Sequence, residues 1–322
     1  MASLPILLLG ATALYIIYYI VDFLALHFYH PSQPLAVYKR KGNEPTYALV
    51  TGSSGGIGLG IAQELVTQGF GVILLGHLPA ELAEAKASLE RRAPGAAVRT
   101  ITMNVVTANP ADLDALALSL KDLKLSILFN NVGGTPYHLP MRELSTMSCL
   151  DIDNTINMNA RFMSRLTSLL LPRLARPAAP GERSLIVNLS SASHVGLPWL
   201  TIYSATKAYN LAFSASLSRE LIANPATSHV DCLAITPGDV QSQSNTQASV
   251  TNSPTWDTYG RCLVLTLDNA ITRGFKVFIP YWFHDFTLRM VPWLPESVRQ
   301  STFTNVIGAK KAAWEAEAAK AK

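Results

Sequence analysis

The sequence predicts an α/β fold with a doubly wound parallel sheet, an N-terminal transmembrane helix and an apolar C-terminal extension. Three observations support this prediction. Residues 4–28 are almost continuously apolar, strand and helix patterns alternate from residue 46 onward, and the first strand pattern runs into a glycine-rich turn. We therefore divide the chain into a membrane anchor (1–30), a linker (31–45), one α/β domain (46–265) and a C-terminal extension (266–322).

The composition favours a membrane-associated protein and excludes several other classes. Of the 322 residues, 49% are hydrophobic and only 15% are charged, whereas ordinary soluble domains carry about 25% charged residues. The net charge is +4 and there is no long basic run, so no nucleic-acid partner is expected. The three cysteines lack the spacing of a disulfide framework or a zinc site, and we predict no metal.

The apolar run at residues 4–28 is long enough to cross a bilayer, which takes roughly 20 residues. A cleaved signal peptide is the alternative, but no Lys or Arg precedes the run and no small-x-small cleavage site follows it. Lys39, Arg40 and Lys41 come after the run, so the positive-inside rule places the domain in the cytosol. Near the end of the run, Asp22 is interpreted as an interfacial residue.

The first strand pattern, Thr46–Val50, leads into the turn at residues 51–58, and an amphipathic helix is predicted at Leu59–Gln68. Strand, glycine-rich turn and helix in this order form the dinucleotide-binding unit of a Rossmann-type fold. The glycines let the backbone approach a pyrophosphate, and the helix N-terminus offers its N–H groups. We therefore assign to the cofactor site Gly52, Ser54, Gly56, Ile57 and Gly58.

These glycines resemble the Thr-Gly-x-x-x-Gly-x-Gly motif of the classical short-chain dehydrogenase/reductases. Gly55 would also fit the Gly-x-x-Gly-x-x-Gly spacing of the extended, epimerase-type members. A later predicted strand, Leu125–Phe129, is followed by Asn-Asn-Val-Gly at 130–133, which resembles the classical members and favours them. The resemblance implies that Asn131 and Gly133 line the cofactor crevice.

The type of nicotinamide cofactor depends on the end of the second strand, predicted at Gly71–Leu75. An acidic residue near this point holds the ribose of NAD, but here the strand ends in Gly76-His77. NADP(H) is therefore favoured over NAD(H), with His77 standing where related reductases often carry Arg; a plain loop residue is the equal alternative. In the third predicted strand, Ile101–Val105, Asn104 stands where the family commonly has an Asp beside the adenine, and the resemblance implies the same place for it.

The candidate proton donor is Tyr203. Lys207 follows it by four positions and shares its helix face, and a nearby ammonium favours the phenolate. In the family that the chain resembles, such a lysine lowers the tyrosine pKa and binds the nicotinamide ribose. A serine polarises the substrate carbonyl there, and an asparagine, matched by Asn159, supports the proton path.

Two serines compete for the carbonyl-polarising role at the end of the predicted strand Leu185–Leu189. Ser190 has the family's usual spacing of thirteen residues from Tyr203, whereas Ser191 matches its Asn-x-x-Ser strand ending. We choose Ser191, because the strand fixes its direction and the loop at 193–198 can absorb a deletion of one residue.

A further predicted strand, Val230–Ile235, is followed by a sequence that resembles the family's Pro-Gly-x-Val-x-Thr motif beside the nicotinamide. A serine replaces the threonine and keeps its hydroxyl. The residues assigned to the cofactor here are Pro237, Gly238, Val240 and Ser242.

Downstream of this motif we predict three further features. Residues 243–259 form a turn-rich substrate loop or lid, and residues 309–322 an exposed helix or frayed end. Residues 275–293 are too charged for a second span. They form either an amphipathic segment facing membrane or substrate, or a core helix.

Within the family, the N-terminal span, Asn-Asn-Val-Gly and Leu-Thr-Ile-Tyr-Ser-Ala-Thr-Lys are most similar to the membrane-bound very-long-chain 3-oxoacyl-CoA reductase and 17β-hydroxysteroid dehydrogenase subgroup. The resemblance implies NADPH-dependent reduction of a ketone on a lipophilic substrate, such as a 3-oxoacyl-CoA, at the endoplasmic reticulum membrane. It also implies contact with membrane lipid and allows a homodimer. Alternatives are a hydroxysteroid or secondary-metabolite ketone as substrate, and a non-catalytic, membrane-anchored nucleotide-binding protein.

Overall fold

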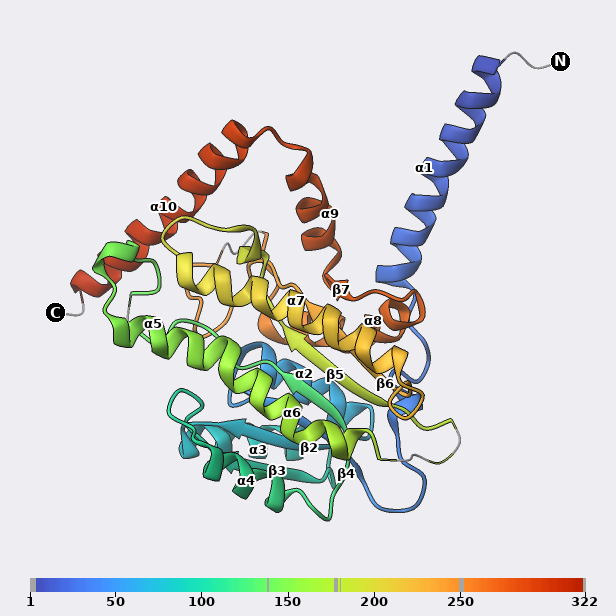
Figure 1. Ribbon diagram of the computed structural model, residues 1–322, viewed down its shortest axis with the longest axis vertical. Helices are drawn as coiled ribbons and strands as arrows, with labels where there is room; N and C mark the ends of the chain where they lie inside the picture. The colour runs from blue at the N-terminus through green and yellow to red at the C-terminus, as the bar shows by residue number, and fades with distance from the viewer. Residues whose placement is uncertain (1–3, 138, 177–178, 180, 249–251, 321–322) are drawn as a thin grey trace.

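The computed structural model describes residues 4–137, 139–176, 179, 181–248 and 252–320. Its strands are β1 (Thr46–Thr51), β2 (Gly71–Gly76), β3 (Val98–Thr102), β4 (Lys124–Asn130), β5 (Ser184–Leu189), β6 (Val230–Ile235) and β7 (Val277–Phe278). Within the described residues they form one seven-stranded parallel sheet in the order β3-β2-β1-β4-β5-β6-β7 (Figure 1). The order reverses between β1 and β4, where nucleotides bind in such folds. The predicted doubly wound sheet is confirmed.

Helices cover both faces of the sheet. One face packs against α2 (Gly56–Thr67), α3 (Pro79–Arg92) and α8 (Trp256–Thr272). The other packs against α4 (Pro110–Ser119), α6 (Phe162–Leu174) and α7 (Thr201–Ala223), while α5 (Cys149–Ile156) precedes α6. Ala48 and Val50 of β1 lie in the first core and Leu49 lies in the second. Because both faces are buried, the central strands are apolar throughout rather than alternating.

Two predicted elements begin three residues away from where they were expected. The third strand was expected at Ile101–Val105, but β3 ends at Thr102, whose partner is the last residue of β2, Gly76. The apolar residues beyond it mark a connection rather than a strand, so that prediction was wrong by three residues. Similarly, α2 begins at Gly56 instead of Leu59, since the glycines of the turn already form its first residues.

The predicted span is the helix α1 (Leu4–Phe28), which projects from the body of the protein (Figure 1). Its segment Leu8–Phe28 has a mean hydropathy of 1.8 and is long and apolar enough to cross a membrane. The end of α1 is fixed to the domain. Asn269 Nδ2 donates to the carbonyls of Leu26 and Tyr29, at 3.3 and 2.5 Å. Asp22 Oδ1 lies 2.9 Å from Arg273 Nε of α8.

The predicted linker is also tied to the domain. It contains a short 3-10 turn at Ala36–Tyr38, in which Tyr38 is buried and its hydroxyl donates to Asp231 Oδ2 at 2.8 Å. The backbone N–H of Leu35 donates to Asp268 Oδ2 at 2.7 Å. These bonds leave the segment between anchor and sheet in a defined position.

The C-terminal region begins inside α8, since residue 265, our predicted domain end, lies within that helix. It contributes β7 to the sheet and then forms α9 (Trp282–Met290), a 3-10 turn at Val291–Trp293 and α10 (Glu296–Lys320). The predicted segment 275–293 is thus a strand followed by a half-buried helix. The predicted tail helix is the second part of α10, and residues 249–251 of the predicted lid lie outside the described residues.

Candidate active site

The glycine turn after β1 is fastened to the end of β4 by Asn131. The Asn131 Nδ2 group donates to the carbonyls of Thr51 and Gly52, both at 2.9 Å. Gly52 has φ +62°, which favours glycine. A Cβ on Gly58 would lie 2.2 Å from the Gly52 oxygen. The turn therefore needs these glycines to close against β4.

The loop after β6 lies against the glycine turn on the side away from Asn131. A Cβ on Gly55 would lie 2.3 Å from Gln243 Oε1, and one on Gly56 would lie 3.6 Å from the Cβ of Ser242. The N-cap residue of α2 is Gly55, which has no side chain to cap the helix, so the first N–H groups of α2 are offered to a ligand. The predicted residues Gly56 and Ser242 are thus brought together, and the residues present fit the diphosphate of a dinucleotide.

A carboxylate that sequence reasoning missed lies at the adenosine end. Ser54 Oγ donates to Glu81 Oε2 at 2.9 Å. The sequence pattern places such an acid directly after β2, but Glu81 comes from the first turn of α3 and folds back to the glycine turn. His77 is exposed, and Asn104 Oδ1 accepts a bond from Val106 N (3.0 Å) just beyond β3. An acid in the first turn of the predicted helix was the signal that could have found Glu81.

The two serines after β5 point to different partners. Ser190 is buried, and its Oγ donates to the backbone oxygen of Lys207 at 2.7 Å. The Ser191 hydroxyl acts on the Tyr203 phenol, whose pKa it lowers, and accepts from Ser193 N at 3.2 Å. Of the two candidates, the geometry brings Ser191 to the phenol and gives Ser190 a structural bond.

Burial dominates the electrostatics of the Tyr203 and Lys207 pair. Lys207 Nζ lies 5.5 Å from the Tyr203 ring centroid and donates to Leu189 O at 3.0 Å. Burial lowers the pKa of Lys207 to about 8. Burial also raises the pKa of Tyr203, against a lowering by the Ser191 hydrogen bond. The expected net lowering of the Tyr203 pKa by Lys207 is therefore not found.

Asn159 lies in a π-helical turn, Asn157–Arg161, between α5 and α6. Its Oδ1 accepts from Gly134 N at 2.9 Å, and its Nδ2 donates to Gly134 O at 2.7 Å and Thr155 O at 2.9 Å. A Cβ on Gly133 would lie 2.7 Å from Lys207 Nζ and 2.8 Å from Asn159 Oδ1. The segment after β4 therefore packs directly between the lysine and the asparagine.

The turn after β6 is held by a histidine that sequence reasoning did not assign. His284 Nδ1 of α9 accepts from Gly238 N at 3.2 Å, and a Cβ on Gly238 would lie 2.8 Å from its ring. Burial lowers the pKa of His284 to about 4, so the imidazole is neutral and able to accept this bond at neutral pH. Pro237 O accepts from Ala192 N at 2.7 Å, which joins the loops after β5 and β6. Val240 is buried beneath the turn.

The arrangement is shared with a known family. The model of the short chain dehydrogenase family matches residues 46–253, more than half of the chain. The chain belongs to the short-chain dehydrogenase family. It is accordingly an NAD(P)-dependent oxidoreductase.

Several relatives of this dehydrogenase are very-long-chain 3-oxoacyl-CoA reductases. The Neurospora crassa protein is 31% identical over 184 residues, which cover 57% of this chain and 54% of that protein. The Pyricularia oryzae protein is 27% identical over 281 residues, covering 86% and 81%. The chain thus spans about half the length of the first of these relatives. A short-chain dehydrogenase from Sphingobium yanoikuyae, solved in complex with NADPH, is 27% identical with a TM-score of 0.60, covering 73% of this chain and 87% of that one.

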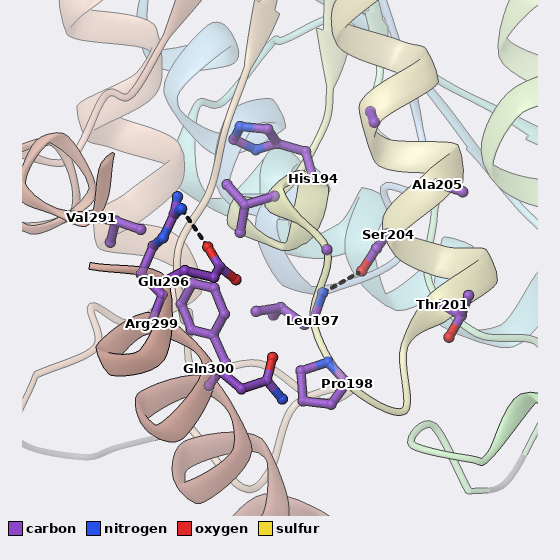
Figure 2. A pocket seen from close by; sticks show the side chains of 14 residues that line it. His194, Leu197, Pro198, Thr201, Ser204, Ala205, Val291, Glu296, Arg299 and Gln300 are labelled. Atoms are coloured by element: carbon purple, nitrogen blue, oxygen red, sulfur yellow. Dashed lines mark hydrogen bonds and ion pairs between the residues drawn. The ribbon is translucent and has the colours of Figure 1, made fainter. Parts of the chain in front are cut away.

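A cavity of about 590 Å³ lies next to the candidate residues of this dehydrogenase, between α7 and the C-terminal region (Figure 2). It does not contain Tyr203 or Lys207, because Ser204 and Ala208 line it from a different face of α7. His194 joins the cavity to the candidate serine, since its Nδ1 lies 2.8 Å from Ser191 O. The rest of the lining comes from Thr201 and Ala205 of α7, from the loop at 195–198 and from the C-terminal region, where Val291, Glu296, Arg299, Gln300 and Phe303 contribute.

Proposed function

We propose that this dehydrogenase is a membrane-anchored ketoreductase that reduces a ketone on a lipophilic substrate, such as a 3-oxoacyl-CoA, with Tyr203 as proton donor. The observation that carries the proposal is the pair formed by the half-buried Tyr203 and the buried Lys207 on α7, with Ser191 near enough to the phenol to lower its pKa. The very-long-chain 3-oxoacyl-CoA reductases among its relatives support this class of substrate. A pure binding protein would have no need of such a phenol and amine pair.

The proposed mechanism uses the chain's own groups to handle the proton. When bound, the nicotinamide cofactor supplies the hydride. The hydroxyls of Ser191 and Tyr203 donate to the ketone oxygen, and Tyr203 transfers its proton to the developing alkoxide. Because burial raises the pKa of Tyr203, the phenol stays protonated at neutral pH, as an acid must.

Two further residues support this step. Lys207, with a pKa of about 8, carries a proton at neutral pH that can replace the one lost by the phenol. Asn159 acts as a positioning residue, because within the described part of the chain its side-chain amide forms its hydrogen bonds with Gly134 and Thr155. Alcohol oxidation would use the same groups in reverse.

We infer that NADP(H) is preferred over NAD(H), since no carboxylate directly follows β2 and the exposed His77 stands there. The Glu81 carboxylate accepts a hydrogen bond from Ser54, and its negative charge would repel a 2′-phosphate at this end of the crevice. Glu81→Gln should therefore lower the KM for NADPH and leave that for NADH within about twofold. Steady-state kinetics with both cofactors measure this, and a native protein that turns over faster with NADH overturns the preference.

Four features stay predictions: location in the endoplasmic reticulum membrane, a cytosolic orientation of the domain, contact with lipid, and a homodimer. The basic residues after α1 support the orientation through the positive-inside rule. A hydroxysteroid or a secondary-metabolite ketone is the second candidate substrate, because the apolar anchor suits any ketone that dissolves in lipid.

The full chain in lipid nanodiscs, supplied with NADPH, tests the proposal against a panel of 3-oxoacyl-CoA thioesters and steroid ketones. We expect ketone-dependent NADPH oxidation that Tyr203→Phe lowers by about 10²–10⁴-fold, the usual contribution of a general acid. Tyr209→Phe, an exposed tyrosine on the same helix, is the matched control and should keep native activity. If no ketone in the panel stimulates NADPH oxidation by the native protein, the non-catalytic alternative replaces the proposal.

A further inference from the structure

The helix α9 presents apolar side chains to the outside. Trp282, Phe286 and Met290 follow one another at intervals of four residues, so they share one face of the helix. All three are exposed, and Trp293 in the turn that follows is 84% exposed. The opposite face of α9 is buried against the domain through His284 and Asp285. We call the four exposed residues Trp282, Phe286, Met290 and Trp293 the α9 face.

The α9 face lies beside the membrane anchor. His27 Nε2 of α1 is 2.9 Å from Asp285 Oδ2, and the rings of Phe28 and Trp282 are 6.3 Å apart. The pKa of Arg289 is raised by its hydrogen bonds to Asp285, against a lowering by burial, and Asp22 of α1 adds to the rise. Figure 1 shows α9 and α1 rising from the same side of the protein.

Charged pairs mark the level at which α1 leaves the domain. Asp22 is paired with Arg273, and Arg289 bonds to both oxygens of Asp285, at 2.8 Å each. Such charges are costly in hydrocarbon, so the surface of a bilayer crossed by α1 lies at about this level. At that level tryptophan is a favoured side chain, and an arginine can extend to lipid phosphates.

We infer that the α9 face docks into the headgroup and acyl boundary of the membrane that α1 crosses. This inference rests on the proposed anchoring by α1. A soluble protein rarely exposes a continuous apolar patch of this kind, and here the patch is continuous with a membrane-spanning helix. Arg289 between Phe286 and Met290 excludes full insertion, so the helix lies at the surface of the bilayer.

Docking would connect the membrane to the active site through the buried face of the same helix. His284 holds Gly238 of the turn assigned to the nicotinamide, and Asp285 holds His27 of α1. The cavity of Figure 2 is lined in part by Val291, directly after α9. A lipophilic ketone leaving the bilayer beside α9 would therefore meet this cavity first.

Tryptophan fluorescence in vesicles tests the docking. The chain has five tryptophans, at positions 199, 256, 282, 293 and 314, and none lies in α1, so the emission reports on the domain alone. The full chain is reconstituted into phosphatidylcholine vesicles with either plain or brominated acyl chains, since bromine quenches only indoles close to it. The variants are the double replacement Trp282→Phe and Trp293→Phe and, as matched control, Trp314→Phe on α10.

We expect brominated lipid to quench the native protein and Trp314→Phe to the same extent, and the double variant to lose most of this quenching. Equal quenching of the native and double-variant proteins overturns the docking. Failure of the native protein to float with the vesicles overturns the anchoring instead. A third outcome also overturns the inference. If the native protein is not quenched and is a dimer, and the double variant is a monomer, then a second copy of the chain covers the α9 face.

Discussion

The cofactor crevice and the C-terminal region are held together by different kinds of contact. Around the crevice, an amide side chain bonds backbone oxygens and glycines leave no room for a Cβ, as at Gly52 and Gly58. In the C-terminal region, side chains pair across the protein, as His27 does with Asp285. Small changes in the crevice should therefore impair catalysis, whereas changes in the C-terminal region should impair stability.

The largest effect is expected where the C-terminal region pairs with α1. Asp285→Ala removes a buried carboxylate that accepts from His27 and Arg289, and should lower the free energy of unfolding by about 3 kcal/mol. This is the lower end of the usual range, because Arg289 is half exposed. Urea titration of the protein in detergent, followed by tryptophan fluorescence, measures the change.

Asp285→Asn is the control for Asp285→Ala, because it keeps the size and one acceptor oxygen of the carboxylate. Its free energy of unfolding should fall by less than that of Asp285→Ala. If Asp285→Ala unfolds at the same urea concentration as the native protein, the side-chain pairs do not stabilise the C-terminal region, and the contrast with the crevice fails.

In the crevice, Gly133→Ala should impair catalysis with little loss of stability. The new Cβ would lie 2.7 Å from Lys207 Nζ and 2.8 Å from Asn159 Oδ1, so both groups must shift. We expect a loss of about 100-fold in kcat/KM, the usual effect of misplacing a catalytic group by about 1 Å. Gly308→Ala, whose Cβ would meet Trp199 at an ordinary 3.5 Å, is the matched control. Native activity in Gly133→Ala would mean that the crevice is not closely packed.

The protonation of Lys207 gives a smaller, pH-dependent effect. Because burial lowers its pKa to about 8, Lys207 is charged below that pH and neutral above it. Ketone reduction should therefore decline above pH 8, approaching tenfold per pH unit if the lysine supplies the proton to Tyr203. The pH profile of kcat with saturating NADPH measures this. A rate that stays constant to pH 10 excludes the lysine from the proton path.

The smallest effect is expected at Asp22, whose pair with Arg273 is partly exposed on both sides. Asp22→Asn should change the free energy of unfolding by less than about 1 kcal/mol, as for most exposed ion pairs. The same urea titration provides the measurement. If Asp22→Asn loses as much free energy of unfolding as Asp285→Ala, the partly exposed pair stabilises the protein as strongly as the buried one.

The sequence was sufficient where a local pattern determines the structure. The central strands, the glycine turn and the shared face of Tyr203 and Lys207 follow from runs of apolar residues and from short spacings. The bounds of β3 did not follow, because an edge strand is half exposed and its apolar pattern continues past its last paired residue, Thr102.

The missed site residues have a common cause. Glu81 reaches Ser54 from the next helix, and His284 reaches Gly238 from a segment 46 positions away. Each contact depends on how α3 or α9 packs, which no short stretch of sequence encodes. The serine choice was open for a similar reason, since Ser190 and Ser191 are separated only by the directions of their side chains.

The junction below α1 has a consequence for how the enzyme searches for substrate. Asn269 holds the last carbonyls of the anchor, and Asp285 holds its histidine, so the domain is mounted on α1 without a free hinge. A domain attached in this way cannot reorient freely in solution, as a domain on a flexible linker can. In a bilayer its active site would stay at a constant height and move only laterally, so that encounters with substrate occur in two dimensions.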